Sequence, residues 1–151
     1  MSIHISKVED PSDRELLALR QELWPHASRQ EHEAELASLF KRPDRFGAII
    51  AFTPEKRGMG FAEFTLRNDY VAGCTTSPVA FLEGLYVRAG FRRLGVATKL
   101  VEAFEDWARK HNVSEVASDV LIDNHESQRF HHAAGFEEIE RAVCYSKKLR
   151  K

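Results

Sequence analysis

The sequence contains few cysteines, and neither Cys74 nor Cys144 belongs to a Cys-x-x-Cys pair. This excludes a disulfide framework and a zinc site built from four cysteines. Histidine is more frequent, with seven residues, but the adjacent pair His131-His132 points in different directions on a helix. His125 lies six residues before His131, which is also a poor ligand spacing on one helix face. We therefore expect no metal site.

Long apolar runs and an excess of one charge are also missing. The longest purely apolar run, 48–52, is far shorter than the roughly 20 residues that span a bilayer. Residues 1–6 do not show the basic region followed by an apolar stretch that is typical of a secretory signal. Lys plus Arg number 22 and Asp plus Glu number 23, without the positive excess of a nucleic-acid binder. We expect a cytoplasmic protein without a membrane or nucleic-acid partner.

The length and apolar content favour one domain. A chain of 151 residues, 43% of them hydrophobic, can bury about two thirds of its unfolded surface. No repeat, low-complexity tract or linker divides it, so we expect a single domain over 1–151.

The apolar periodicity predicts an α/β domain with a mixed sheet, in the order ααβββαβαβ. The first helix follows a capped start at 10–13 and ends at Trp24-Pro25, because proline disfavours a helical residue before it. Three further helices are predicted over 29–40, 95–111 and 124–134, and strands over 46–52, 60–67, 79–87, 115–121 and 141–149.

The stretch 85–97 carries an apolar strand into a turn and then into an amphipathic helix. The first N–H groups of a helix lack internal partners, and the helix dipole adds positive potential there. Small residues at Gly95 and Ala97 allow close approach, and residues 88–99 hold four basic side chains and no acid. This favours a phosphate site, although an ordinary helix start with solvated arginines is the alternative. Walker and G-x-G-x-x-G patterns are absent, which disfavours a nucleotide-binding protein.

Residues 92–97, Arg-Arg-Leu-Gly-Val-Ala, match the [RQ]xxGx[GA] signature of GCN5-related N-acetyltransferases in its strand–turn–helix position. Asn124 and residues 130–136 resemble the second acetyl-coenzyme A motif of that family. The resemblance implies acetyl-coenzyme A as cosubstrate and a sheet flanked by helices. It further implies that two central strands, the one ending at Val87 and the one at about 115–120, splay apart. It also implies contacts to the cosubstrate from Leu85, Tyr86, Val87, Arg92, Arg93, Leu94, Gly95, Val96, Ala97, Thr98 and Asn124.

Within this family the chain resembles the aminoglycoside 6′-N-acetyltransferases. The resemblance is carried by residues outside the generic motifs, namely 23–25, 67–74, 77–78, 81–87, 117–119 and 135–141. It implies acetylation of the 6′-amino group of aminoglycosides, and hence antibiotic resistance. It also implies a homodimer in which the C-terminal strand contributes to the partner.

The charge distribution agrees with a polycationic acceptor. Residues 115–140 contain seven acids and one base, although for any single acid a solvated surface position is the alternative. Such a segment attracts ammonium groups, and aromatic rings cover sugar faces or cations. The substrate-binding candidates are Trp24, His26, Tyr70, Glu83, Asp119 and Glu140.

Glu83 interrupts an apolar strand, where a carboxylate is costly to bury unless it is paired. Strand alternation predicts that Phe81, Glu83 and Leu85 share one face, and an outward-facing edge position is the alternative. In the family this position faces the acceptor amine, and Asp119 is its counterpart on the neighbouring strand. We expect Glu83 and Asp119 to be catalytic, holding the ammonium and accepting its proton directly or through water.

The expected mechanism is direct attack of the amine on the thioester in a ternary complex, with a strand N–H near Leu85 stabilising the oxyanion. Neither cysteine has a convincing neighbouring base, which disfavours an acetyl-cysteine route. His131 replaces the tyrosine that many relatives use as general acid, so either His131 protonates the thiolate or no acid is needed. Other acceptors (a polyamine, a lysine or a protein N-terminus) and a non-catalytic acyl-coenzyme A-binding module are the alternatives.

Overall fold

The computed structural model describes residues 2–151, which form two compact units. The first ends at Asp119 and the second begins at Val120, and each is described by itself. The expectation of a single domain stays a prediction. Among residues 2–151, no helix is both long and apolar enough to cross a membrane.

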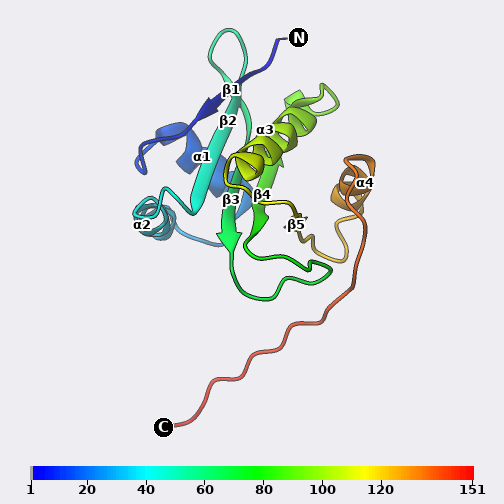
Figure 1. Ribbon diagram of the computed structural model, residues 1–151. Helices are drawn as coiled ribbons and strands as arrows, with labels where there is room; N and C mark the ends of the chain where they lie inside the picture. Colours follow the sequence, from blue (N-terminus) through cyan, green and yellow to red (C-terminus); the bar gives the residue numbers. More distant parts are fainter. Residues whose placement is uncertain (1) are drawn as a thin grey trace. The chain divides into compact units, whose positions relative to one another are not determined.

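The first unit is a five-stranded mixed sheet with helices on both faces (Figure 1). The strands lie in the order β1-β2-β3-β4-β5, and all neighbours are antiparallel except β4 and β5, which are parallel. This confirms the α/β class and the mixed sheet. The elements are β1 (His4–Lys7), α1 (Arg14–Leu23), α2 (Arg29–Leu39), β2 (Phe46–Phe52), β3 (Gly58–Arg67), β4 (Val79–Val87), the 3-10 helix η1 (Ala89–Phe91), α3 (Val96–Lys110) and β5 (Val116–Ser118).

Strand β1 is missing from the sequence prediction. It has four residues, and it pairs with β2 from His4 opposite Phe52 to Lys7 opposite Ile49. A strand this short at a sheet edge shows too little alternation to be recognised, because pairing with its neighbour defines it.

Helices α1 and α2 cover one face of the sheet, and α3 covers the other (Figure 1). On the first face, the ring of Trp24 packs edge-on against Phe61 of β3, with 6.0 Å between ring centroids. On the second face, Phe64 of β3 packs against Phe104 and Trp107 of α3. Odd-numbered positions of β3 near these residues therefore face α1 and α2, and even-numbered positions face α3.

The sheet opens between β4 and β5. Within the described residues, β5 pairs with β4 only from Ala80 opposite Val116 to Leu82 opposite Ser118. Strand β4 continues to Val87 while β5 ends at Ser118, earlier than the predicted 121. This confirms the splayed central strand pair.

A β-bulge at Glu83 interrupts the alternation along β4. Glu63 lies opposite Gly84 and Phe64 lies opposite Leu82, so Glu83 is one extra residue on its strand. The bulge moves Leu85 to the α3 face, opposite Ala62. The prediction that Phe81, Glu83 and Leu85 share a face is therefore wrong for Leu85, because a one-residue shift exchanges the two faces of a strand.

The second unit contains α4 (His125–Ala133), which begins where the Asn124 side chain accepts a hydrogen bond from the Ser127 N–H at 3.1 Å. Every residue from 137 to 151 is exposed and without regular structure. The predicted strand over 141–149 is wrong for this chain. A strand requires hydrogen bonds to a neighbouring strand, and none pairs with this segment in the described part of the chain.

Candidate active site

The carboxylate of Glu83 is held by two side chains of β3. Thr65 Oγ1 donates to Oε2 at 2.6 Å, and Arg67 donates from Nε to Oε2 at 3.0 Å and from Nη2 to Oε1 at 2.7 Å. Oε2 thus receives two hydrogen bonds and Oε1 one, so Oε1 keeps acceptor capacity for a further donor. The side chain is 29% exposed. Glu83 is therefore neither an unpaired buried charge nor a fully solvated edge residue.

Arg67 also stacks on an aromatic ring and borders a hollow. Its guanidinium carbon lies 3.4 Å from the centroid of the Phe81 ring. The hollow has a volume of about 830 Å³ and is lined by Arg42, Arg45, Leu66, Arg67, Asn68, Asp69 and Tyr70. Tyr70, a predicted substrate residue, is 86% exposed there. Three arginines, Arg42, Arg45 and Arg67, line the hollow. The sequence pattern did not predict positive charge beside Tyr70.

Asp119 lies at the point where β4 and β5 separate. Leu82 is the last residue of β4 paired with β5, opposite Ser118, and Glu83 and Asp119 follow directly on the two strands. Asp119 is exposed. The register thus brings both predicted carboxylates to the mouth of the splay, and their catalytic roles stay predictions.

Trp24 reaches the same region from the end of α1. Its backbone N–H donates to the Arg20 carbonyl at 2.7 Å, which is the last hydrogen bond of the helix. A Cβ placed on Gly84 would lie 2.6 Å from Cη2 of the Trp24 ring. Only glycine at this position lets the indole approach β4 beside Glu83. His26, the other candidate on this segment, is exposed.

A buried polar network that the sequence prediction missed lies behind Trp24. Arg20 Nη1 donates to both carboxylate oxygens of Glu63 at 2.5 and 2.6 Å, and Nε donates to His32 Nδ1 at 3.2 Å. Nη2 donates to Glu35. The exposed fractions of Arg20, His32 and Glu63 are only 1%, 2% and 2%. Burial raises the pKa of Glu63 to about 7, against the lowering effect of Arg20.

The sequence carried a signal for this network. Arg20 lies four residues from both Leu16 and Trp24, on the apolar face of its helix. Glu63 interrupts the apolar stretch 59–66 in the same way as Glu83 interrupts 79–87. One cation and one anion at buried positions indicate that the two side chains pair with each other.

The turn before α3 has the backbone geometry expected of an anion site. Arg93 and Gly95 both have a positive φ, 65° and 84°, and residues 92–95 are exposed. Gly95 is the residue before the helix, and no side chain within the described residues caps the first amides of α3. These amides from Val96 to Thr98 point out of the helix start, as anion binding requires.

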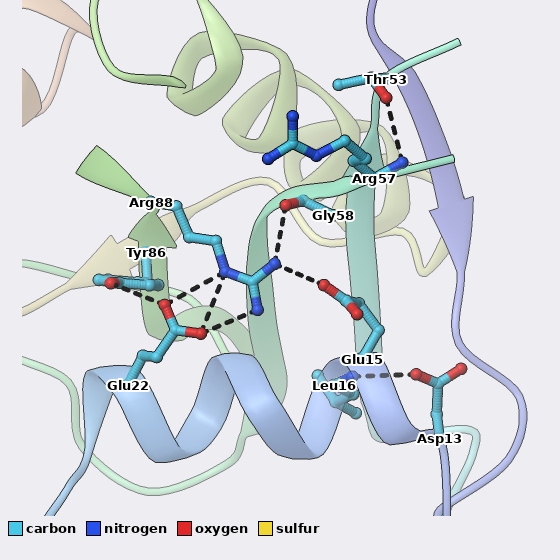
Figure 2. Close-up of polar contacts among 9 residues, drawn as sticks. All are labelled: Asp13, Glu15, Leu16, Glu22, Thr53, Arg57, Gly58, Tyr86 and Arg88. Atoms are coloured by element: carbon cyan, nitrogen blue, oxygen red, sulfur yellow. Dashed lines mark hydrogen bonds and ion pairs between the residues drawn. The ribbon is translucent and has the colours of Figure 1, made fainter. Parts of the chain in front are cut away.

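Arg88 does not serve this turn. Figure 2 shows its guanidinium between Glu15 and Glu22 of α1, with a further hydrogen bond to the Gly58 carbonyl at 2.9 Å. Hydrogen bonds from Arg88 hold the pKa of Glu22 below its usual range. Of the four basic residues in 88–99, Arg88 is therefore neutralised by two carboxylates of α1.

The cosubstrate candidates at the end of β4 lie beyond the last residue that pairs with β5. The Tyr86 hydroxyl donates to Glu22 at 3.1 Å, and burial raises the pKa of Tyr86. Arg92 Nε donates to the Val87 carbonyl at 2.9 Å and tethers the turn to the strand. Leu85 and Leu94 complete these candidates, and Leu94 is 44% exposed.

Three candidates belong to the second unit. Asn124 uses its side-chain oxygen to cap α4, and Glu140 is exposed. His131 Nδ1 lies 2.8 Å from the Ser127 carbonyl, so this nitrogen carries the proton and donates. Their expected roles toward the cosubstrate and acceptor stay predictions. In the described part of the chain, no group of three or more His, Cys, Asp or Glu side chains is arranged to hold a metal ion.

Known proteins with similar sequences and structures are acetyltransferases. A curated relative named aminoglycoside N(6′)-acetyltransferase type 1, from Serratia marcescens, is 46% identical over 133 residues, 88% of this chain and 90% of the relative. A relative of the same name from Klebsiella aerogenes is 40% identical over 149 residues, 96% of each chain.

Solved structures agree over nearly the whole chain. The structure of AAC(6′)-Iy in complex with the bisubstrate analogue CoA-S-monomethyl-acetylneamine has a TM-score of 0.92 and 36% identity, covering 99% of this chain and 100% of that one. AAC(6′)-Ih from Acinetobacter baumannii, an aminoglycoside antibiotic 6′-N-acetyltransferase, has a TM-score of 0.89 and 37% identity over 99% and 100%. The sequence profile of the acetyltransferase (GNAT) family matches residues 14–136. The chain therefore belongs to the acetyltransferase (GNAT) family.

Proposed function

We propose that this protein transfers the acetyl group of acetyl-coenzyme A to the 6′-amino group of aminoglycosides. The observation that carries the proposal is identity of 46% over 133 residues with a protein named for that reaction. The structural similarity to AAC(6′)-Iy bound to a bisubstrate analogue, at 36% identity, supports the same donor and acceptor.

The open edge of β4 and the start of α3 suit the two ends of acetyl-coenzyme A. Residues 85–87 extend past the pairing with β5, which leaves the strand edge for the pantetheine arm. The exposed turn at Arg92–Gly95 and the amides of Val96–Thr98 suit the pyrophosphate, because partial positive charge gathers at a helix start. Asn124 is the proposed further contact from the second unit.

Glu83 and Asp119 suit the acceptor amine. Both follow the last paired residues of β4 and β5, and Oε1 of Glu83 has room for one more hydrogen bond. We assign to them the binding of the ammonium and the removal of its proton, directly or through water, before the neutral amine attacks the thioester carbonyl. A β4 N–H near Leu85 would stabilise the oxyanion. Trp24, His26, Tyr70 and Glu140 are the further proposed substrate contacts.

Direct attack is favoured over an acetyl-cysteine intermediate. Burial raises the pKa of the Cys74 thiol, and the charge of Glu115 raises it further. Cys144 is exposed in the segment without regular structure. A thiol with a raised pKa is a poor nucleophile, because the thiolate is the reactive form.

The test of this function is thiol release from acetyl-coenzyme A with kanamycin or tobramycin, compared with spermine and a lysine peptide. We expect turnover with the aminoglycosides and a mass increase of one acetyl group on the 6′-nitrogen. Turnover with the peptide or spermine and none with an aminoglycoside would overturn the proposal. Binding of acetyl-coenzyme A without thiol release for any acceptor would favour a non-catalytic acyl-coenzyme A-binding module.

We further propose a homodimer and a cytoplasmic location. The exposed apolar side chains of Val143, Tyr145 and Leu149 in the C-terminal segment support the dimer, because a partner subunit would cover them. Light scattering on the purified protein tests the dimer, and a monomeric mass at working concentration would contradict it. Acetyl-coenzyme A as donor suits the cytoplasm, and cell fractionation tests that location.

A further inference from the structure

We propose that Arg20 is a positioning residue for the acceptor site: together with Glu63 and His32 it fixes the indole of Trp24 beside Glu83. The inference rests on the proposed function, since it assigns Trp24 to the acceptor wall. It concerns three side chains that none of the proposed catalytic steps uses.

The first step is the number of contacts that converge on one guanidinium. Arg20 bonds to Glu63, His32 and Glu35, and its guanidinium carbon lies 5.0 Å from the centroid of the Trp24 ring. The planar fork of arginine holds several partners in fixed directions, which lysine does not do. Arg20 therefore ties α1, α2 and β3 together at one point.

The second step runs from His32 to the backbone of Trp24. His32 Nδ1 accepts from Arg20, so its Nε2 carries the proton and donates to the Trp24 carbonyl at 3.1 Å. Arg20 thus selects the neutral tautomer of His32 that holds the end of α1. The Trp24 N–H is bound to the Arg20 carbonyl as well. The Trp24 N–H is thus held by the helix backbone, and the Trp24 carbonyl is held by the His32 side chain that Arg20 orients.

The third step is the confinement of the indole ring. Its face lies near Arg20, Phe61 packs edge-on to it at 6.0 Å, and its far end abuts Gly84. The ring also borders a cavity of about 280 Å³ lined by Arg20, Trp24, Ala27, Glu31, His32 and Glu35. This cavity lies on the side of α2, and the contacts with Arg20, Phe61 and Gly84 confine the ring to one orientation beside β4.

The network is ionic, although folding stability alone does not require it. Burying an arginine and a glutamate removes both from water, and apolar residues of similar volume are often as stable or more so. Stability alone therefore gives little reason for Arg20 and Glu63. A fixed direction for the Trp24 ring gives one, because apolar side chains do not impose a hydrogen-bond geometry.

The kinetic test compares the purified full chain with Arg20→Lys, Glu63→Gln and the matched control Arg29→Lys, whose Arg29–Glu33 pair on α2 is exposed. We expect the first two variants to raise KM for kanamycin about tenfold or more, since misplacing a binding wall weakens binding. KM for acetyl-coenzyme A stays within about twofold, and the control matches the wild type. An unchanged kanamycin KM, or equal rises of both KM values, would overturn the proposal.

A double variant, Arg20→Met with Glu63→Leu, separates positioning from folding. It removes both charges together, so no buried charge is left without a partner. We expect it to unfold at a temperature near that of the wild type while keeping the raised kanamycin KM. A normal kanamycin KM in this variant would show that the network only supports the fold.

A spectroscopic test reads Trp24 directly. The chain has two tryptophans, so Trp107→Phe leaves Trp24 as the single reporter. In that background we expect the double variant to speed the local rotation of Trp24, measured by fluorescence anisotropy decay. In the Trp24→Phe background the remaining Trp107, on α3, keeps its anisotropy. Unchanged Trp24 rotation would overturn the inference. If the wild type does not acetylate kanamycin, the proposed function fails, and the anisotropy alone decides whether Arg20 holds Trp24.

Discussion

Two arginine–glutamate pairs lie on the same face of β3 and β4, and burial separates them more than geometry does. In each pair the arginine donates two hydrogen bonds to the carboxylate. The side chains of Arg20 and Glu63 are 1% and 3% exposed, whereas those of Arg67 and Glu83 are 41% and 29% exposed. Removing one member of the Arg20–Glu63 pair leaves the other as a buried charge without water. In the Arg67–Glu83 pair, water or an incoming ammonium is able to replace the missing partner. The buried pair therefore suits a framework, and the accessible pair suits exchange with substrate.

The largest expected effect comes from breaking the buried pair. Glu63→Ala leaves Arg20 without its main partner, and we expect a loss of about 3–5 kcal/mol in the free energy of unfolding. Glu83→Ala, at the accessible pair, is expected to cost about 1 kcal/mol or less. Urea denaturation of both variants measures the difference. Equal losses would remove the distinction between the two pairs.

The pH dependence of stability sharpens the same contrast. Burial raises the pKa of Glu63 to about 7, above the value of an unfolded chain. The folded protein then binds the Glu63 proton more tightly than the unfolded chain does. The proton therefore adds to the free energy of unfolding, fully below about pH 4.5, and this stabilisation is lost as the pH rises through 7. The expected change is about 3 kcal/mol. The charged or titratable groups facing Glu63 are Arg20 from α1, His32 and Glu35 from α2, and Glu83 from β4.

Unfolding by urea at several pH values between 5 and 8 measures this dependence, and Glu63→Gln is the control because its amide does not titrate. We expect the wild type to lose stability across this range and the variant to lose less. Parallel curves for the two proteins would contradict a raised pKa at Glu63.

The next effect concerns catalysis at the accessible pair. We expect Glu83→Gln to lower kcat with kanamycin about a hundredfold, because the amide keeps the shape but does not accept the proton of the ammonium. KM for acetyl-coenzyme A should change little. Asp119→Asn, tested in parallel, should also lower kcat. A wild-type rate across the whole pH range in either variant would remove that residue from the mechanism.

The smallest effect is expected at Arg67. Its guanidinium takes one acceptor position on each carboxylate oxygen of Glu83, so fewer positions are left for an acceptor ammonium. Arg67→Gln removes this competitor, so we expect KM for kanamycin to fall by a few fold and stability to change by about 1 kcal/mol or less. Steady-state kinetics at low and moderate salt measure the effect. A higher KM would show that Arg67 orients Glu83 for the acceptor instead of competing with it.

The sequence predicted the parts of the fold that repeat within one element. The apolar spacing of Val96, Leu100 and Phe104 predicted α3 within about a residue at each end, and the splay followed from the family signature at 92–97. The partners of Arg20 and Arg67 were not predictable, because each pair joins residues that only the tertiary fold brings together. The prediction missed β1 and wrongly placed a strand at 141–149 for a related reason. Pairing with another segment decides whether a short extended stretch forms a strand.

The bulge at Glu83 also governs which changes of length the protein tolerates. The adjacent residues Glu63 and Phe64 of β3 lie opposite Gly84 and Leu82 of β4, so β4 carries one extra residue there. The alternation of side chains along β4 after Glu83 is therefore shifted by one position relative to the alternation before it. Deleting Glu83 would remove the bulge and leave the flanking residues on their present faces, whereas inserting one more residue would require a second bulge or turn one part of the strand inside out. Gene variants that lengthen this segment by one residue should therefore be far rarer among functional clones than insertions of equal size in the loop 68–78, whatever residue they introduce.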